Sequence, residues 1–137
     1  MTDYSQQGLE LRRQMFGKAG ADDHIANASE FMQPVQDLVT RVCFGEIWQR
    51  PHLDLKMRSM LTLAMLVAQG RTHEIRIHTR GALANGATKE ELKELFLHSF
   101  PYIGLPLMID GILACEDEIR KVEAGQAIGD LHEGDHG

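Results

Sequence analysis

Apolar side chains recur at spacings of three, four and seven residues along most of this chain, as expected for one face of an α-helix. The pattern is organised around residues 72–92, where Ile75, His78 and Ala82 share one face. This spacing predicts that His78 points toward the core, although histidine is polar. Because buried polar groups need partners, we expect Glu74, one turn earlier on the same face, to partner His78.

Residues that favour helix ends delimit this segment. Thr72 is a candidate N-cap, and the pair Asn85-Gly86 is typical of a left-handed helix stop. Thr88 and Glu91 have the spacing of a capping box, in which each residue bonds to the backbone of the other. The sequence therefore predicts one helix, a tight glycine turn and the start of a second helix.

Four further helices are expected from the same periodicity. They are a helix within residues 1–17, one from Ser29 to before Arg50, one from the cap Asp54 to Gly70, and one from about Pro106 onward. Residues 18–28 are expected to form a loop. The helix after Ser29 is expected to bury an apolar stripe made of Val35, Leu38, Val39, Val42 and Ile47. The helix after Asp54 is apolar on nearly every side, which predicts a central position or a subunit interface.

These elements define an all-α fold, a bundle of about six helices. No alternation of apolar and polar residues persists as it would in a strand. The chain has 137 residues, enough for one core, so we expect a single domain over residues 1–124. Residues 125–137 contain four glycines and several acidic residues and are expected to form a disordered tail.

The charge of the chain restricts its partners. A formal net charge of -6 argues against nucleic acid as a ligand, because a clustered basic surface would be expected. It leaves an anionic substrate possible, since a few arginines can make a local positive pocket. The longest apolar run, Met60 to Ala68, is too short to span a membrane, and no secretory signal is apparent, so we expect a cytoplasmic protein.

Neither the cysteines nor the histidines have the spacing of a redox or metal motif. Cys43 and Cys115 are far apart without a CxxC pair, and we expect both to be packing residues. His73 and His78 are five residues apart, about 140° around a helix, whereas the HExxH zinc motif places both histidines on one face. His132 and His136 lie in the acidic tail, where solvated side chains are the simpler interpretation. No metal and no cofactor are therefore expected.

Several motifs resemble the carboxymuconolactone decarboxylase family. They are FGEIWQRPHLDLKMRSMLT at 44–62, EIRIH at 74–78, NGATKEELKE at 85–94, YIGLP at 102–106 and GLELRRQMFG at 8–17. The resemblance extends over about residues 8–120 and implies the all-α alkylhydroperoxidase D-like bundle, usually a homotrimer or homohexamer. Peroxidases of the wider superfamily place a CxxC pair at the positions of Arg71 and Glu74, where this chain has no cysteine.

The resemblance also implies a reaction and its residues. In the family a carboxylate leaves an unsaturated lactone, the ring carbonyl takes up the electrons as a dienolate, and a proton adds beside the carbonyl. His78 and Glu46 are implied as the acid–base pair, either of which could deliver the proton. The implied substrate-binding residues are cationic or aromatic: Arg50, Arg58, Trp48, Tyr102 and His98.

Each implied role has a simpler structural alternative, and one segment departs from the family. An inward histidine is more often a core residue, and an arginine at a helix start more often forms a surface ion pair. Residues 107–110, Leu-Met-Ile-Asp, replace smaller residues and an asparagine, which leaves the substrate open. The main hypothesis is cofactor-free decarboxylation of a small anionic lactone. The alternatives are a same-fold enzyme for another carbonyl acid, a peroxidase disfavoured without CxxC, and a non-catalytic oligomeric binding protein.

Overall fold

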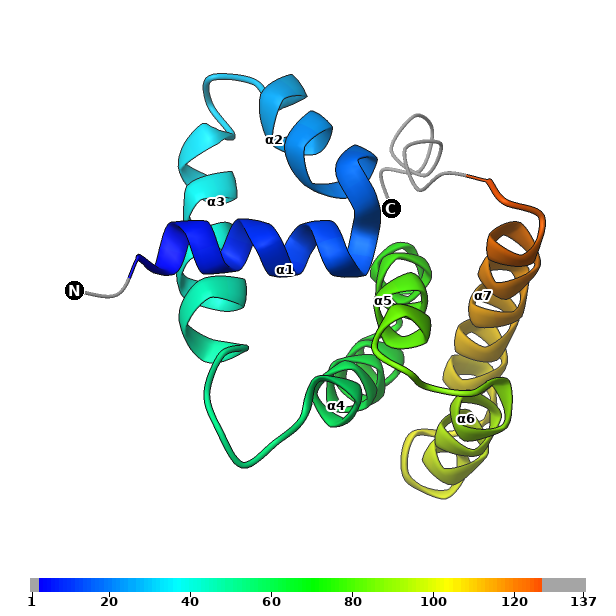
Figure 1. Cartoon of the computed structure of the whole chain (residues 1–137). Helices are drawn as coiled ribbons and strands as arrows, with labels where there is room; N and C mark the ends of the chain where they lie inside the picture. Colours follow the sequence, from blue (N-terminus) through cyan, green and yellow to red (C-terminus); the bar gives the residue numbers. More distant parts are fainter. Residues whose placement is uncertain (1–2, 127–137) are drawn as a thin grey trace. The chain divides into compact units, whose positions relative to one another are not determined.

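A computed structural model describes residues 3–126, and every regular element in that range is helical (Figure 1). The all-α prediction is confirmed for this range. The chain divides into two compact units, Met1–Asp54 and Leu55–Gly137, which are described separately below. The single domain expected over residues 1–124 stays a prediction. The tail expected over residues 125–137 lies outside the described residues from position 127 onward.

The first unit consists of three α-helices and two π-helical segments. Their bounds are α1 (Tyr4–Lys18), η1 (Ala19–Asp23), α2 (His24–Asn27), α3 (Gln33–Leu38) and η2 (Val39–Ile47). The first helix turns at Gly17, whose φ of 71° is left-handed, so its predicted end is confirmed. The loop expected over residues 18–28 is wrong, because η1 and α2 continue the helical backbone there.

Two glycines let α1 cross η2 with the two backbones in contact, and Figure 1 shows α1 lying across the α3–η2 helix. A Cβ on Gly8 would lie 1.8 Å from the Thr40 carbonyl oxygen, and one on Gly45 would lie 2.0 Å from the Tyr4 carbonyl oxygen. No larger residue fits at either position without separating the helices. The crossing therefore depends on glycine at both positions.

The face that α3 and η2 bury carries Gln36 and Thr40 beside Phe44 and Gly45. Only Val39 and Val42 of the predicted apolar stripe are even partly buried, so the stripe as predicted is wrong. Val35, Leu38 and Ile47 are each more than two-fifths exposed, whereas Gln36 and Thr40 are buried. The reason is Arg12 of α1, which is 4% exposed. Its guanidinium donates to Gln36 Oε1 at 3.0 Å, to Thr40 Oγ1 at 2.8 Å and to the Gly20 carbonyl at 3.2 Å. A buried guanidinium needs acceptors, and these residues supply them.

The second unit consists of four longer helices with an apolar core. Their bounds are α4 (Leu55–Gln69), α5 (Thr72–Ala84), α6 (Lys89–Ile103) and α7 (Leu105–Glu123). The helix α4 contacts the other three helices, and so does α7. Met57, Leu61 and Met65 of α4 are at least two-fifths exposed, so α4 is not enclosed by helices on every side, and its expected central place stays a prediction. The core includes Leu63, Ile75, Leu92 and Phe96, none of which is exposed.

The helix ends in the second unit follow the predicted signals with one correction. The capping box of Thr88 and Glu91 forms in both directions, and Gly86 is left-handed at φ 96°. The correction is that Thr72 is the first helical residue and the N-cap is Arg71. The helix α6 continues through Pro101 to Ile103 and ends at Gly104, whose φ of 93° and ψ of 164° favour glycine.

A buried ion pair joins α5 to α7. Arg80 Nε lies 2.5 Å from Glu118 Oε1, with side-chain exposures of 12% and 0%. Arg76, one turn earlier, pairs with Asp117, and this pairing lowers the pKa of the Asp117 carboxyl. The two pairs fix how α5 lies along α7, and α5 is the helix that carries His78.

Candidate functional site

His78 lies in the middle of α5, between two residues of the core. Ile75 and Thr79 are fully buried, and His78 itself is partly buried. Burial lowers the pKa of His78 from 6.5 to about 4, and the negative charge of Glu74 offsets only part of this effect. At neutral pH the imidazole is therefore neutral. It can donate one N–H to a developing negative charge without first taking up a proton.

Glu74, the expected partner of His78, is bound by another residue. Arg71 donates to its carboxylate from Nη2 at 3.0 Å and from Nε at 3.3 Å. This pairing lowers the pKa of Glu74, so the carboxylate stays charged. The negative charge of Glu74 raises the pKa of His78 and so opposes the effect of burial described above.

Arg58 is on α4, the helix that packs directly against α5. The Asn85 amide fixes their alignment, because it donates to Ser59 Oγ at 2.9 Å. Arg58 therefore lies beside the C-terminal end of α5, and His78 lies seven residues before Asn85, about 10 Å along the helix. Arg58 and His78 therefore lie on neighbouring helices, about two turns apart along α5.

The three implied residues of the first unit lie at and after the end of η2. Glu46 and Arg50 are exposed. Trp48 is 7% exposed and packs on Phe44 with ring centroids 5.3 Å apart, and Phe44 in turn contacts Phe16 at 5.8 Å. Trp48 therefore has a place in the aromatic core of its own unit. The pairing of Glu46 with His78 stays a prediction.

The two remaining implied residues, His98 and Tyr102, lie together on the last turns of α6. Their rings are 5.4 Å apart, His98 is exposed and Tyr102 is 77% exposed. In the departing segment, Met108 packs against the core, whereas Ile109 and Asp110 are exposed. The roles of these residues in substrate binding stay predictions.

The cysteines are free thiols in different units. Cys43 is partly buried and Cys115 is buried. Burial raises the pKa of both thiols, because a thiolate is poorly solvated there. Their expected role as packing residues agrees with these positions, and neither has the low pKa of a reactive cysteine.

Sequence reasoning missed the buried charges of both units. Three charged residues, Arg12, Arg80 and Glu118, lie on the core-facing sides of their helices. A charged residue at a position where the helical pattern expects an apolar one is the signal that could have found them.

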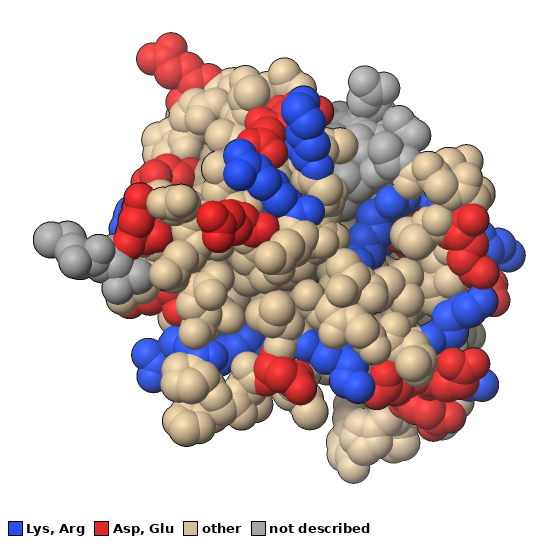
Figure 2. Space-filling view, in the orientation of Figure 1, with Lys and Arg blue, Asp and Glu red and all other residues tan. Residues whose placement is uncertain are grey.

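The charges on the surface are mixed in sign: Figure 2 shows Lys and Arg interspersed with Asp and Glu on the face drawn. Within residues 3–126 no three metal-binding side chains gather, and no helix is long and apolar enough to cross a membrane.

Comparisons with known proteins give the family. The profile of the carboxymuconolactone decarboxylase family matches residues 33–117. The chain is 44% identical to a 4-carboxymuconolactone decarboxylase of Acinetobacter baylyi over 73% of this chain and 75% of that protein. It is 37% identical to a nitrosuccinic acid decarboxylase of Metarhizium robertsii, over 85% of this chain and 81% of that protein.

The chain therefore belongs to the carboxymuconolactone decarboxylase family. Both of these relatives are decarboxylases, which supports the carboxy-lyase class for this chain. The name of one relative specifies a lactone acid and that of the other a nitro acid.

Proposed function

We propose that this protein decarboxylates a small carboxylic acid whose electrons can move onto a neighbouring electron-withdrawing group. The names of the two relatives specify a nitro acid and a lactone acid, and each of these acids carries such a group. In each case the bond to the carboxylate carbon breaks, carbon dioxide leaves, and the electron pair moves to a carbonyl or a nitro group. A proton then adds to the carbon skeleton, beside the ring carbonyl in the lactone and at the carbon next to the nitro group in the nitro acid.

The observation that carries this proposal is the neutral imidazole of His78, whose pKa is about 4. A neutral N–H aimed at the oxygen that gains charge stabilises the transition state more than the ground state. We propose that Arg58, about two turns away along the helix pair, binds a carboxylate of the substrate. Glu46 is then proposed to relay the proton, and Arg50, Trp48, Tyr102 and His98 to complete the binding site.

The first candidate substrate is 4-carboxymuconolactone, in which the ring carbonyl accepts the electrons. The higher identity of the lactone decarboxylase supports this choice. The second candidate is nitrosuccinate, in which the nitro group accepts them as a nitronate, and the longer match to the nitro-acid decarboxylase supports it. A peroxidase is disfavoured because neither thiol pKa is low.

The test is release of carbon dioxide from each substrate by wild type, His78→Asn and His73→Asn. His73 is on the same helix, about 140° around from His78, so His73→Asn is the matched control. We expect turnover of at least one substrate, a loss of about 100-fold or more in kcat for His78→Asn, and little change for the control. If wild type turns over neither acid, both candidate substrates are wrong. Equal losses in the two variants would contradict the role of His78.

We further propose a homo-oligomer, as the family resemblance implies. Several large apolar side chains of α4 and α7 are at least two-fifths exposed, among them Leu61, Met65, Leu105 and Leu113. Such surfaces favour association. Light scattering of the purified chain tests this proposal, and a monomeric mass would contradict it.

A further inference from the structure

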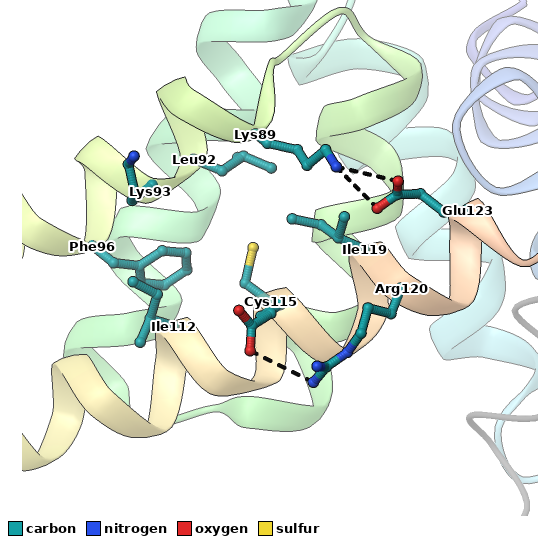
Figure 3. A pocket seen from close by; sticks show the side chains of 10 residues that line it. Lys89, Leu92, Lys93, Phe96, Ile112, Cys115, Ile119, Arg120 and Glu123 are labelled. Atoms are coloured by element: carbon teal, nitrogen blue, oxygen red, sulfur yellow. Dashed lines mark hydrogen bonds and ion pairs between the residues drawn. The ribbon is translucent and has the colours of Figure 1, made fainter.

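A pocket of about 320 Å³ opens between α6 and α7, and it contains none of the residues proposed for decarboxylation. Its floor is part of the apolar core: Leu92 and Phe96 are fully buried and Cys115 is 3% exposed. Figure 3 shows the Cys115 sulfur directed into the space between the two helices. The volume lies at the lower end of the range for small-molecule sites, about 300–1,000 Å³. It suits one small ligand with an apolar body.

The side chains that line the opening of the pocket carry more positive than negative charges. Lys89 pairs with Glu123 at 3.1 Å, and Arg120 pairs with Glu116 at 3.5 Å, so these four charges neutralise one another (Figure 3). Lys93 also lines the pocket and has no ion pair with any residue between 3 and 126. Among the residues that the structure describes, the opening therefore carries one positive charge without an acidic partner, above an apolar floor.

The thiol on the floor does not supply a reaction. Burial raises the pKa of Cys115, and its neighbours Glu116 and Glu118 raise it further, although a bond with Thr79 opposes them. The neutral thiol is therefore an apolar contact for a ligand. It also gives a chemical probe, because a ligand in the pocket would cover it.

We propose that this pocket binds a small monocarboxylate whose alkyl or aryl body fills the space between α6 and α7 and whose carboxylate pairs with Lys93. A polyanionic ligand fits less well, because Lys89 and Arg120 at the opening already have acidic partners. The site is separate from His78 and its ligand binds independently of the proposed decarboxylation.

Calorimetry on the full chain tests whether the ligand's carboxylate pairs with Lys93. The two probes are octanoate and its neutral analogue octanamide. We expect octanoate to bind more tightly than octanamide. Lys93→Met keeps the apolar stem of the side chain and should weaken octanoate binding about fivefold, the effect of one partly exposed ion pair. The matched control is Lys121→Met, which removes a lysine of α7 outside the pocket and should change neither affinity.

Alkylation of Cys115 tests the location. In a Cys43→Ser background, Cys115 is the one remaining thiol of the chain, and octanoate should slow its alkylation. Ile112→Trp, which fills the pocket, should abolish octanoate binding, with circular dichroism showing that the variant folds. The alkylation result does not depend on that variant.

Three results would each overturn the proposal. Equal affinities for octanoate and octanamide, or an unchanged affinity in Lys93→Met, would show that the charge of Lys93 is not used. Alkylation unaffected by octanoate would place any binding elsewhere. Absence of octanoate binding would also overturn it. A changed mass of Ile112→Trp in light scattering would then show that a second copy of the chain covers the groove. Because these readouts are binding and protection, failure of the proposed decarboxylation would leave them unchanged.

Discussion

The two units each bury an arginine, and they satisfy it in different ways. In the first unit, Arg12 donates to neutral oxygens of a glutamine, a threonine and a backbone carbonyl. Burial accordingly lowers the pKa of Arg12. In the second unit, Arg80 is paired with the fully buried carboxylate of Glu118. The second unit also holds the partly buried His78, whose pKa of about 4 leaves it uncharged at neutral pH.

The difference lies in what remains when one partner is removed. Loss of a neutral acceptor or of Arg12 leaves polar groups unsatisfied, whereas loss of Glu118 leaves a buried positive charge without its counter-charge. A group that has already lost its charge, such as His78, becomes costly only when the solvent protonates it. Removal of Arg12, removal of Glu118 and protonation of His78 should therefore lower the free energy of unfolding by different amounts.

The largest expected effect is that of Glu118→Leu, which strands Arg80. We expect the free energy of unfolding to fall by about 3–5 kcal/mol, as for other broken buried ion pairs. The double variant Arg80→Met with Glu118→Leu should regain most of this loss, because it removes both charges. Denaturant unfolding followed by circular dichroism measures both. A double variant as unstable as the single one would contradict the argument.

Arg12→Met is the matched change in the first unit. It leaves neutral acceptors behind, so we expect a smaller loss of about 2 kcal/mol. Trp48 is the one tryptophan of the chain, and its fluorescence reports unfolding of the first unit. If Arg12→Met cost more than Glu118→Leu, neutral acceptors would be the stronger way to hold a buried arginine here.

The second prediction concerns His78 and acid. Its pKa is 6.5 in the reference state and about 4 in the fold, so the unfolded chain takes up the proton first as the pH falls. Its stabilising contribution is complete above pH 6.5 and is lost between there and about pH 4, a total of about 3 kcal/mol. His78→Asn should therefore show a shallower loss of stability with acid than wild type. Denaturant unfolding across this pH range measures the two slopes, and equal slopes would contradict the burial argument.

The sequence predicted the second unit well because its core is apolar. Leu92, Phe96 and Cys115 have the helical spacing that places them inside, and all three are buried. The capping box at Thr88 also follows from local chemistry. The same spacing placed His78 on the inward face of its helix. It did not show that Glu74 pairs with Arg71 and not with His78. Arg71 is three residues from Glu74 and His78 is four, and both spacings bring side chains together on a helix.

The first unit was predicted poorly because it buries polar residues. A reading of apolar periodicity turns Val35 and Leu38 inward, but Arg12 lies against the opposite face and requires Gln36 and Thr40 there. These partners are 24 and 28 residues from Arg12, and no local pattern relates them. For the same reason the sequence could propose the site residues of each unit but not their contacts.

The third prediction compares a glycine from each unit. In Gly8→Ala the new Cβ would lie 1.8 Å from a backbone oxygen of η2, which cannot move without separating the helices. In Gly111→Ala it would meet Val67 Cγ2 at 2.6 Å and Phe96 Cε1 at 3.0 Å, which belong to core side chains and not to the backbone. Both changes gain the helix preference of alanine, worth up to about 1 kcal/mol.

The collision with the backbone should therefore decide the difference. We expect Gly8→Ala to lower the free energy of unfolding by about 2 kcal/mol and Gly111→Ala by less than about 1 kcal/mol. Trp48 fluorescence follows the first variant, and hydrogen exchange of the α7 amides follows the second. Equal effects would mean that α1 and η2 can separate as easily as two core side chains can repack. The crossing of these helices would then not depend on glycine at position 8.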